Sequence, residues 1–280
     1  MKDTVREFCL KTGVPEEIMA LMPEGIPTEY SSIYDDLIRW ESCPRAVAAM
    51  SSLIEENPDN GLLCLLIYIE AALAVKTEYE KKRIPDAIYY DTMRCFARFC
   101  AEYKMVNGVW GYANVAWPVR QVNFRLFRLG RLEFELLAFP HEDTNIGGLR
   151  LTKGCPVVSV HIPCGSPLDH NACCGSYQQA RTFFKQYFPD FQPQAFYCAS
   201  WLLFPGLSDI LPADSNILAF QKDYTLVDSS FGDFGMMWRI FGRERENLED
   251  YPIQTTLQRN LVRHLKNGGL IGAGMGVIPL

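Results

Sequence analysis

A histidine near the end of a short apolar segment is the first residue in this sequence that could carry out acid–base chemistry. His161 lies two residues before Pro163, which closes the segment Pro156–Pro163. An imidazole titrates near neutral pH, so it can act as a general base toward an amine. On a strand, its side chain would share a face with Ser159. The alternative is a hydrogen-bonded histidine that only fixes the following loop.

Two carboxylates and one tyrosine extend this set of candidate acid–base residues. Glu133 and Glu135 are two positions apart in an alternating segment, so both would point to the same face of a strand. Either could accept a proton, although a solvent-facing hairpin explains the pair equally well. Tyr197, in a second β-rich segment, could donate a proton to a leaving group.

The cysteines give weaker evidence, for a nucleophile or a metal site, than the acid–base residues give for proton transfer. A covalent mechanism through Cys198 would need a thiolate with a histidine nearby, and His161 could supply it, but a buried core thiol is the alternative. The sequence has no Cys-x-x-Cys pair, and adjacent Cys173 and Cys174 on a helix would point about 100° apart. We therefore predict no metal site.

Two further patterns suggest phosphate binding. The run that contains Arg120, Arg125, Arg128 and Arg131 could hold phosphates, and a solvated hairpin face is its alternative. The glycine-rich tail at 268–276 resembles a nucleotide loop, but it follows a helix instead of a strand. A bent final strand explains the tail better.

The elements that must position these residues alternate between strands and helices in the second part of the chain. A turn near Leu129-Gly130 predicts a hairpin within Asn123–Phe139. The other predicted elements are strands at Pro156–Pro163, Gln194–Leu203, Asn216–Lys222 and Leu270–Pro279, helices at Asp169–Tyr187 and Thr255–Lys266, and one helical turn at Pro205–Leu211. This order predicts a mixed sheet with helices packed on it.

The first part of the chain has the periodicity of helices throughout. Predicted helices cover Thr4–Lys11, Pro15–Met22, Glu29–Glu41, Pro44–Glu56, Leu62–Val75 and Pro85–Lys104. The most apolar run, Gly61–Val75, is interrupted by Glu70 and indicates a core helix, not a membrane span. We expect an α+β protein with a helical domain at 1–120 and a mixed-sheet domain at 121–280.

Composition narrows the function classes. The chain has 280 residues, a net charge of −6 and a pI near 5.3, which disfavours nucleic-acid binding. Its first residues, MKDTVREFCLKTG, do not have the pattern of a signal peptide. Ten cysteines then favour a reducing, cytoplasmic location. All four histidines lie after residue 118, which places acid–base chemistry in the second part.

Two segments of that second part resemble a known family. They are VSVHIPCGSPLDHNACCGSYQQARTFF and YCASWLLFPGLSDILPADSNILAFQ, and the matching positions are His161-Ile-Pro163, Gly165, Pro167-Leu168, Ser200–Leu203 and Ser215–Ile217. The pattern is similar to that of bacterial acyltransferase-like proteins with a helical N-terminal domain and a GNAT-like C-terminal domain. The resemblance implies that fold for the mixed sheet, with acetyl-CoA or another acyl-CoA as co-substrate.

In a GNAT fold, a strand, a loop and a helix N-terminus hold the pyrophosphate of the acyl donor. The equivalent unit here would be Val157–Ile162, Pro163–Leu168 and Asp169–Tyr187, and the strand Ala195–Leu203 would splay away from the first strand. The residues expected at the cofactor are Ile162, Pro163, Gly165, Ser166, Cys173, Ser176 and Ser200. The loop departs from the usual glycine-rich pattern, because it has one glycine, two prolines and no basic residue.

The function expected from the resemblance is transfer of an acyl group to a primary amine by direct attack. His161 or Glu133 would be the base, and Tyr197 the acid. We expect a small-molecule amine acceptor and no nucleic-acid or membrane partner, and we leave a homo-oligomer open. The alternative, favoured by the altered loop, is a non-catalytic binding module on the same scaffold.

Overall fold

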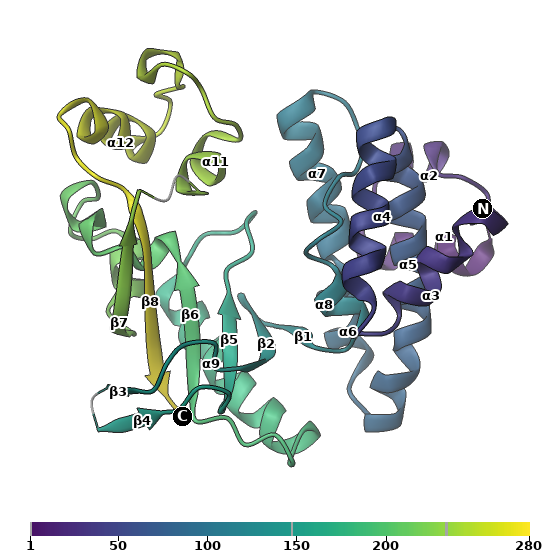
Figure 1. Cartoon of the computed structure of the whole chain (residues 1–280), viewed down its shortest axis with the longest axis horizontal. Helices are drawn as coiled ribbons and strands as arrows, with labels where there is room; N and C mark the ends of the chain where they lie inside the picture. Colours follow the sequence, from purple (N-terminus) through teal and green to yellow (C-terminus); the bar gives the residue numbers. More distant parts are fainter. Residues whose placement is uncertain (1, 147, 233–234) are drawn as a thin grey trace. The chain divides into compact units, whose positions relative to one another are not determined.

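The chain folds into two units, Met1–Leu129 and Gly130–Leu280. The computed structural model (Figure 1) describes residues 2–146, 148–232 and 235–280. The first unit is helical and the second contains a sheet with helices, as the α+β prediction requires. The contacts divide the chain nine residues after the boundary that we predicted at residue 120.

The first unit consists of helices and ends with a short strand. They are α1 (Asp3–Thr12), α2 (Glu16–Leu21), α3 (Ser31–Leu37), α4 (Cys43–Glu56), α5 (Asn60–Lys82), α6 (Asp86–Met93), α7 (Cys95–Asn107) and α8 (Val119–Val122), followed by β1 (Leu126–Leu129). Strand β1 leads through Gly130, at φ +67°, into the second unit. Only glycine adopts this left-handed conformation readily, which explains the turn predicted at Leu129-Gly130.

Helix α5 is the central helix of the first unit. It is long and apolar enough to cross a membrane by length and composition, with a mean hydropathy of 1.5 in its most apolar window. Within the unit, however, 61% of that window is buried, and Leu65, Tyr68 and Ile69 have no exposed surface. The burial supports the prediction of a core helix for this segment.

The second unit is built on a mixed sheet. Its strands are β2 (Leu132–Ala138), β5 (Pro156–His161), β6 (Ala195–Ser200), β7 (Thr225–Phe231) and β8 (Gly272–Pro279), and they lie in the order β2-β5-β6-β8-β7. Strands β5 and β6 are parallel, whereas β2 with β5, β6 with β8 and β7 with β8 are antiparallel. The small hairpin β3 (Thr144–Ile146) and β4 (Leu149–Leu151) is separate.

Helix α9 (His170–Tyr187) covers one face of this sheet. It begins where predicted, because the Asp169 carboxylate accepts a hydrogen bond from the N–H of Ala172 at 2.8 Å. Its inward side chains meet strand aromatics: Tyr177 lies 5.4 Å from Phe196 of β6 and 6.3 Å from Phe134 of β2, between ring centroids. These contacts fix the N-terminus of α9 relative to β2 and β6.

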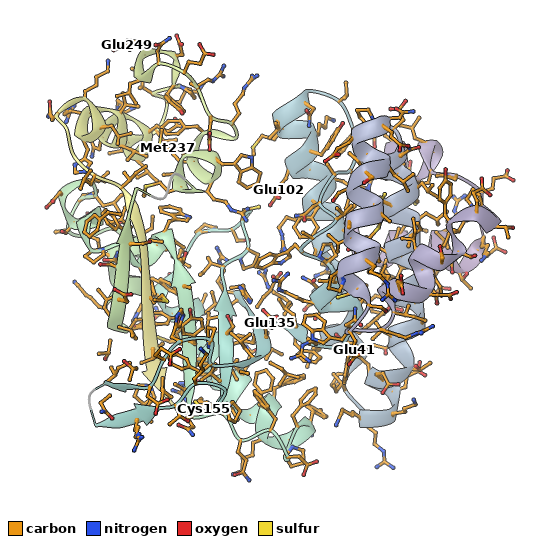
Figure 2. All side chains as sticks on the ribbon, viewed as in Figure 1. Glu41, Glu102, Glu135, Cys155, Met237 and Glu249 are labelled. Carbon is orange, nitrogen blue, oxygen red and sulfur yellow. The ribbon has the colours of Figure 1, made fainter. Side chains whose placement is uncertain are left out.

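The opposite face of the sheet is covered at one end by the β3–β4 hairpin. Ile146 and Leu151 of that hairpin pack with Val157, Tyr197 and Val277 of the sheet. Cys155, labelled in Figure 2, belongs to the same cluster and immediately precedes β5. This cluster closes the face near the beginning of β5.

The segment Asn216–Lys222, which we predicted to be a strand, is instead helix α10 (Asn216–Gln221). Ser215 caps it by accepting a hydrogen bond from the N–H of Ile217. The periodicity of a short apolar run does not tell a strand from a buried helical turn. Here the cap at Ser215 favours the helix. The next strand is β7, which we did not predict.

A second apolar cluster lies beyond the sheet and is formed by helical segments. It joins η3 (Pro205–Asp209), α11 (Gly235–Phe241) and α12 (Thr256–Lys266) through Leu207, Met236 and other side chains. Helix α12 follows Thr255, the first residue of the predicted helix, which caps it and forms a reciprocal capping box with Gln258. Helix α11 was not predicted from the sequence.

The glycine-rich tail is strand β8, as predicted. A Cβ atom on Gly274 would lie 2.1 Å from the carbonyl oxygen of Leu203, and one on Gly272 would lie 1.9 Å from that of Ser230. The glycines therefore permit β7 and the short helix η2 (Trp201–Leu203) to approach the strand closely.

Candidate active site

Strands β5 and β6 pair at one end and separate at the other. Their ladder consists of Val158 with Phe196 and Ser159 with Tyr197. After these positions β5 continues to His161 and β6 to Ser200 with no further pairing, although both segments are fully described. The pairing therefore stops before the carboxyl ends of the two parallel strands, which is where the resemblance implies a splayed opening.

One face of the sheet at this opening carries the predicted acid–base residues. Glu133 lies opposite His161, and Glu135 lies opposite Ser159, in the register of β2 and β5. Tyr197 of β6 lies in the same row as Glu135 and Ser159, because it pairs with Ser159. All of these side chains lie on the face away from α9, as strand alternation predicts.

His161 is held by a carboxylate. Its Nε2 lies 2.8 Å from Oε2 of Glu135, whose side chain is 7% exposed, and the imidazole is 20% exposed. Because a carboxylate can only accept, Nε2 carries the hydrogen, and a neutral ring has its lone pair on Nδ1. Glu135, labelled in Figure 2, therefore sets the tautomer of the candidate base.

Both glutamates are buried, so a solvent-facing hairpin is the wrong explanation for them. Glu133 is 2% exposed and Glu135 is 6% exposed. Buried carboxylates are retained where they are paired or hydrogen-bonded, which agrees with the contact between Glu135 and His161.

Tyr197 lies on the same face but contacts a different histidine, His141. Its hydroxyl lies 2.7 Å from Nε2 of His141 and 3.3 Å from Sδ of Met275. Burial raises the pKa of Tyr197 to about 12, so the phenol keeps its proton at neutral pH. A tyrosine in this state can donate a proton but cannot act as a base.

Cys198 cannot pair with His161 in a covalent mechanism. It follows Tyr197 and therefore points to the opposite face, toward α9. Its side chain has no exposed surface, and burial raises the pKa of the thiol to about 12. The alternative of a core thiol is the correct one.

The loop between β5 and α9, residues 162–169, contains four of the residues expected at the cofactor. Ile162 is half-buried, Pro163 is buried, and Gly165 and Ser166 are exposed. Gly165 has φ +87°. In the described part of the chain, the N–H groups of Gly165, Ser166 and Leu168 donate to no protein acceptor. An exposed run of such amides is suited to an anion.

Arg131 binds the carbonyl groups of this connecting loop. Its guanidinium donates to three carbonyl oxygens: from Nη1 to Pro163 at 2.9 Å, from Nη2 to Ser166 at 2.8 Å and from Nε to Pro167 at 2.8 Å. Arg131 is 9% exposed. A solvated hairpin face is thus the wrong interpretation for this member of the arginine run.

The predictions for the side chains of Cys173 and Ser176 need correction, whereas the role of Ser200 at the cofactor stays a prediction. Cys173 and Ser176 have no exposed surface. The Ser176 hydroxyl donates to the Ala172 carbonyl and accepts from the N–H of Arg131 at 2.7 Å. Ser200 accepts from the N–H of Leu202 and caps η2. The Cys173 thiol and the Ser176 hydroxyl serve the packing and the turn before β2, because helix geometry directs both side chains inward.

A cluster with mixed donor atoms lies at the start of α9. His170, Cys174 and Asp223 each offer one atom within 4.8 Å of the others, and His170 Nε2 lies 2.9 Å from Asp223 Oδ1. These three side chains could offer nitrogen, sulfur and oxygen ligands to a divalent cation. The sequence did not indicate the cluster, because Asp223 is distant along the chain.

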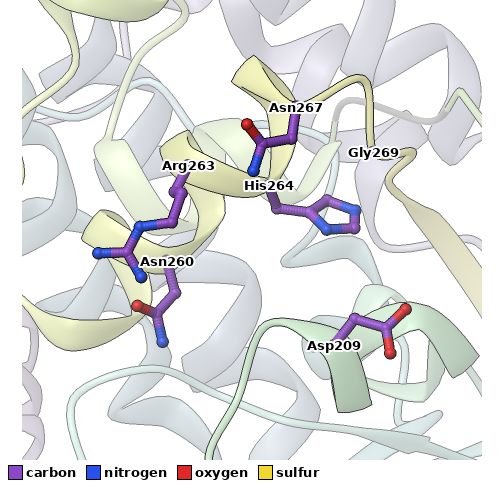
Figure 3. A pocket seen from close by; sticks show the side chains of 6 residues that line it. All are labelled: Asp209, Asn260, Arg263, His264, Asn267 and Gly269. Atoms are coloured by element: carbon purple, nitrogen blue, oxygen red, sulfur yellow. The ribbon is translucent and has the colours of Figure 1, made fainter.

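A polar cavity of about 300 Å³ lies elsewhere in the second unit (Figure 3). It is lined by Asp209, Asn260, Arg263, His264, Asn267 and Gly269. These residues come from η3, α12 and the segment that follows α12, and none lies on β5, β6 or the connecting loop. The cavity is therefore separate from the candidate active site.

Comparison with known families agrees with this geometry. Residues 126–278 match the GNAT-like C-terminal domain, and residues 3–124 match the N-acyltransferase N-terminal domain. The chain belongs to the family defined by the GNAT-like C-terminal domain. No curated protein matches the chain.

Solved structures of acyltransferases share the fold. A mutant crystallised with octanoyl-CoA is 22% identical, with a TM-score of 0.81 over 100% of this chain and 88% of that one. An acyltransferase with CoA and 10C-teicoplanin is 24% identical, with a TM-score of 0.79 and the same coverage. Another, with decanoyl-CoA, is 24% identical, with a TM-score of 0.77 and the same coverage. At these identities the likeness establishes the fold.

Sequence reasoning missed two contributors to the site, because it did not single out His141 and treated Arg131 as one of four equivalent arginines. It named Glu135 with Glu133 as a candidate proton acceptor but did not predict its contact with His161. Alternation places Glu135 on the same face of its strand as Glu133, but its contact with His161 also depends on the register between β2 and β5. Nothing in the local sequence indicates the long-range contacts of Arg131.

Proposed function

We propose that this protein is an acyl-CoA-dependent N-acyltransferase that acts on a primary amine by direct attack. The observation that supports it most is the separation of β5 and β6 beyond Ser159 and Tyr197, beside the His161–Glu135 pair. Splayed strands leave room for an extended thioester arm, and the pair supplies a base next to it. The exposed amides of the connecting loop fit the pyrophosphate of the donor.

In this proposal the chain's own residues move two protons while a C–N bond forms and a C–S bond breaks. His161 accepts the proton that the attacking amine loses, and Glu135 stabilises the imidazolium that results. Tyr197 donates its proton to the departing thiolate, since its pKa of about 12 keeps the hydroxyl protonated. Glu133, buried on the same face, is the second candidate for the base.

The acceptor class and the location are also proposals. Solved relatives were crystallised with teicoplanin and with octanoyl-CoA or decanoyl-CoA, which supports a small-molecule acceptor and a medium-length acyl chain. A cytoplasmic location is supported by the cysteines, which form no disulfide, all ten of them being in described residues.

A binding module without catalysis is the second candidate, and Asp169 favours it. Its carboxylate already caps the N-terminus of α9, where it would repel an approaching phosphate. Pro163 and Pro167 remove two further amide donors from the connecting loop.

Two measurements test the proposed function. Acetyl-, octanoyl- and decanoyl-CoA are first titrated in a thermal-shift experiment, in which ligand at 100 times its dissociation constant should stabilise the native state by about 2.7 kcal/mol. Thiol release with a panel of primary amines then measures transfer. If an acyl-CoA binds but no amine in the panel is acylated, the result would favour the binding module. If no acyl-CoA shifts the melting temperature, both acyl transfer and acyl-CoA as the donor would be refuted.

A further inference from the structure

The connecting loop lacks the glycines and the basic residue that usually shape a phosphate-binding loop, yet it has a defined conformation. The guanidinium of Arg131, which comes from the turn before β2, accounts for that conformation through its bonds to the carbonyls of Pro163, Ser166 and Pro167. A planar fork of donors that binds three converging acceptors fixes the backbone more firmly than an ammonium group can.

The carbonyl contacts also decide where the amides of the loop point. A trans peptide is planar, so its N–H is directed opposite to its C=O. With the carbonyls of Pro163 and Pro167 turned toward Arg131, the N–H groups of Cys164 and Leu168 are turned away from it. Within the described residues, the N–H groups of Gly165, Ser166 and Leu168 donate to no protein atom. The loop thus presents amides outward and carbonyls inward.

Arg131 is itself held in place by α9. The N–H of Arg131 and the N–H of Leu132 both donate to the Ser176 hydroxyl, at 2.7 Å and 3.3 Å. A Cβ on Gly130 would lie 2.8 Å from the same hydroxyl, so the turn packs directly on the helix. The turn, the loop and the helix therefore form one connected unit.

We propose that Arg131 is a positioning residue that shapes residues 163–168 into the cradle for the donor's pyrophosphate, in place of a glycine-rich loop. In this role Arg131 acts through the loop and not on the phosphates, since Nε, Nη1 and Nη2 each donate to a loop carbonyl. Its buried positive charge lies behind the amides and offsets the carboxylate of Asp169 at the helix end. This inference rests on the proposed function, because it assumes an acyl-CoA donor.

The test compares two acyl donors that differ in the pyrophosphate. Steady-state kinetics are measured with octanoyl-CoA and with octanoyl-pantetheine, which lacks the pyrophosphate and the nucleotide. In Arg131→Lys, which keeps the charge but loses the fork, KM for the CoA donor should rise about tenfold or more, because charge-assisted bonds that order the loop are lost. KM for octanoyl-pantetheine, and kcat with either donor, should change less than twofold.

Matched variants separate this role from a general loss of structure. Arg181→Lys changes an arginine of the same unit, on α9, that contacts the Phe196 ring and not the loop, and it should leave both KM values unchanged. Ser176→Ala keeps the guanidinium but removes its anchor, and should raise KM for the CoA donor alone. Circular dichroism confirms folding of each variant.

The outcomes distinguish this inference from the proposed function. Equal KM changes for both donors, or no change in Arg131→Lys, would overturn the role of Arg131 while leaving the transferase intact. If the wild-type protein does not bind CoA in a calorimetric titration, the proposed function fails, and the cradle fails with it. If Arg131→Lys does not fold, the Ser176→Ala variant decides the question by the same split between donors.

Discussion

At the scale of single residues, the site depends on which face of the sheet each side chain occupies. Glu135, Ser159 and Tyr197 form one row across three strands, and Glu133 lies beside His161 in the next. Cys198, one residue further along β6, is excluded from this face. In the proposed mechanism, His161, Glu135 and Tyr197 on this face transfer the protons, whereas the thiol of Cys198 belongs to the core.

Glu135→Gln should lower kcat/KM about a hundredfold, because an amide neither fixes the tautomer of His161 nor stabilises its protonated form. Steady-state kinetics at saturating acceptor measures the effect. Glu133→Gln is the matched control on the same face. A larger loss in Glu133→Gln than in Glu135→Gln would make Glu133 the base.

Tyr197→Phe should lower kcat about tenfold or more, with little change in KM for the donor. Since burial raises the pKa of Tyr197 to about 12, the hydroxyl carries its proton at every pH below that value. The wild-type rate should therefore show no descending limb from Tyr197 between pH 7 and pH 10. A pH–rate profile of both proteins checks this, and an unchanged kcat in Tyr197→Phe would remove Tyr197 from the mechanism.

At the scale of elements, local sequence signals explain the parts that were predicted correctly. Asp169 and Thr255 cap α9 and α12, and Gly130 marks the turn before β2, so each signal lies within three residues of the structure it causes. Helix α10 was missed because its apolar run is short and its cap is a single serine. Periodicity gives no answer at that length.

The candidate site was predictable only in part for a similar reason. His161 and Tyr197 followed from residue type and strand alternation, which are local properties. The contact between Glu135 and His161 depends on strand register, and the bonds from Arg131 to Pro163 span 32 residues. Register and long-range side-chain contacts are set by tertiary packing, so a single sequence does not specify them.

A pair of glycine variants tests the packing of β8 and α9. Gly274→Ala should destabilise the protein by roughly 1–3 kcal/mol, because its Cβ would overlap the Leu203 carbonyl. Gly175→Ala, in the middle of α9 with open space around it, should stabilise the protein by about 0.5–1 kcal/mol. Urea unfolding measures both, and equal effects of the two variants would contradict the close approach at β8.

At the scale of the whole molecule, buried thiols link stability to alkaline pH. Burial raises the pKa of Cys9 and Cys173 to about 11, and that of Cys64, Cys100 and Cys198 to about 12. In the unfolded chain these thiols ionise near pH 8.5, whereas in the native state they stay protonated. The native state therefore binds more protons above that pH, and stability falls as the pH rises.

Unfolding experiments between pH 8 and pH 10.5 should show this loss. Each buried thiol contributes a decrease of up to about 1.4 kcal/mol per pH unit in the free energy of unfolding. Cys198→Ala should reduce the slope by one such contribution, even though the variant is less stable at neutral pH. Cys164→Ala, at an exposed thiol, serves as the control and should leave the slope unchanged. A slope that does not differ between wild type and Cys198→Ala would contradict the raised pKa.

The position of β8 has a consequence for how the protein is made. Strand β8 lies between β6 and β7, yet residues 272–279 are synthesised after every other strand of the sheet. During translation, β6 therefore exposes one unpaired edge until these residues leave the ribosome, and β7 has no neighbour to join. The wall of the opening that β6 forms is completed only when β8 pairs with it, so a nascent chain should acquire ligand affinity only after residues 272–279 have left the ribosome.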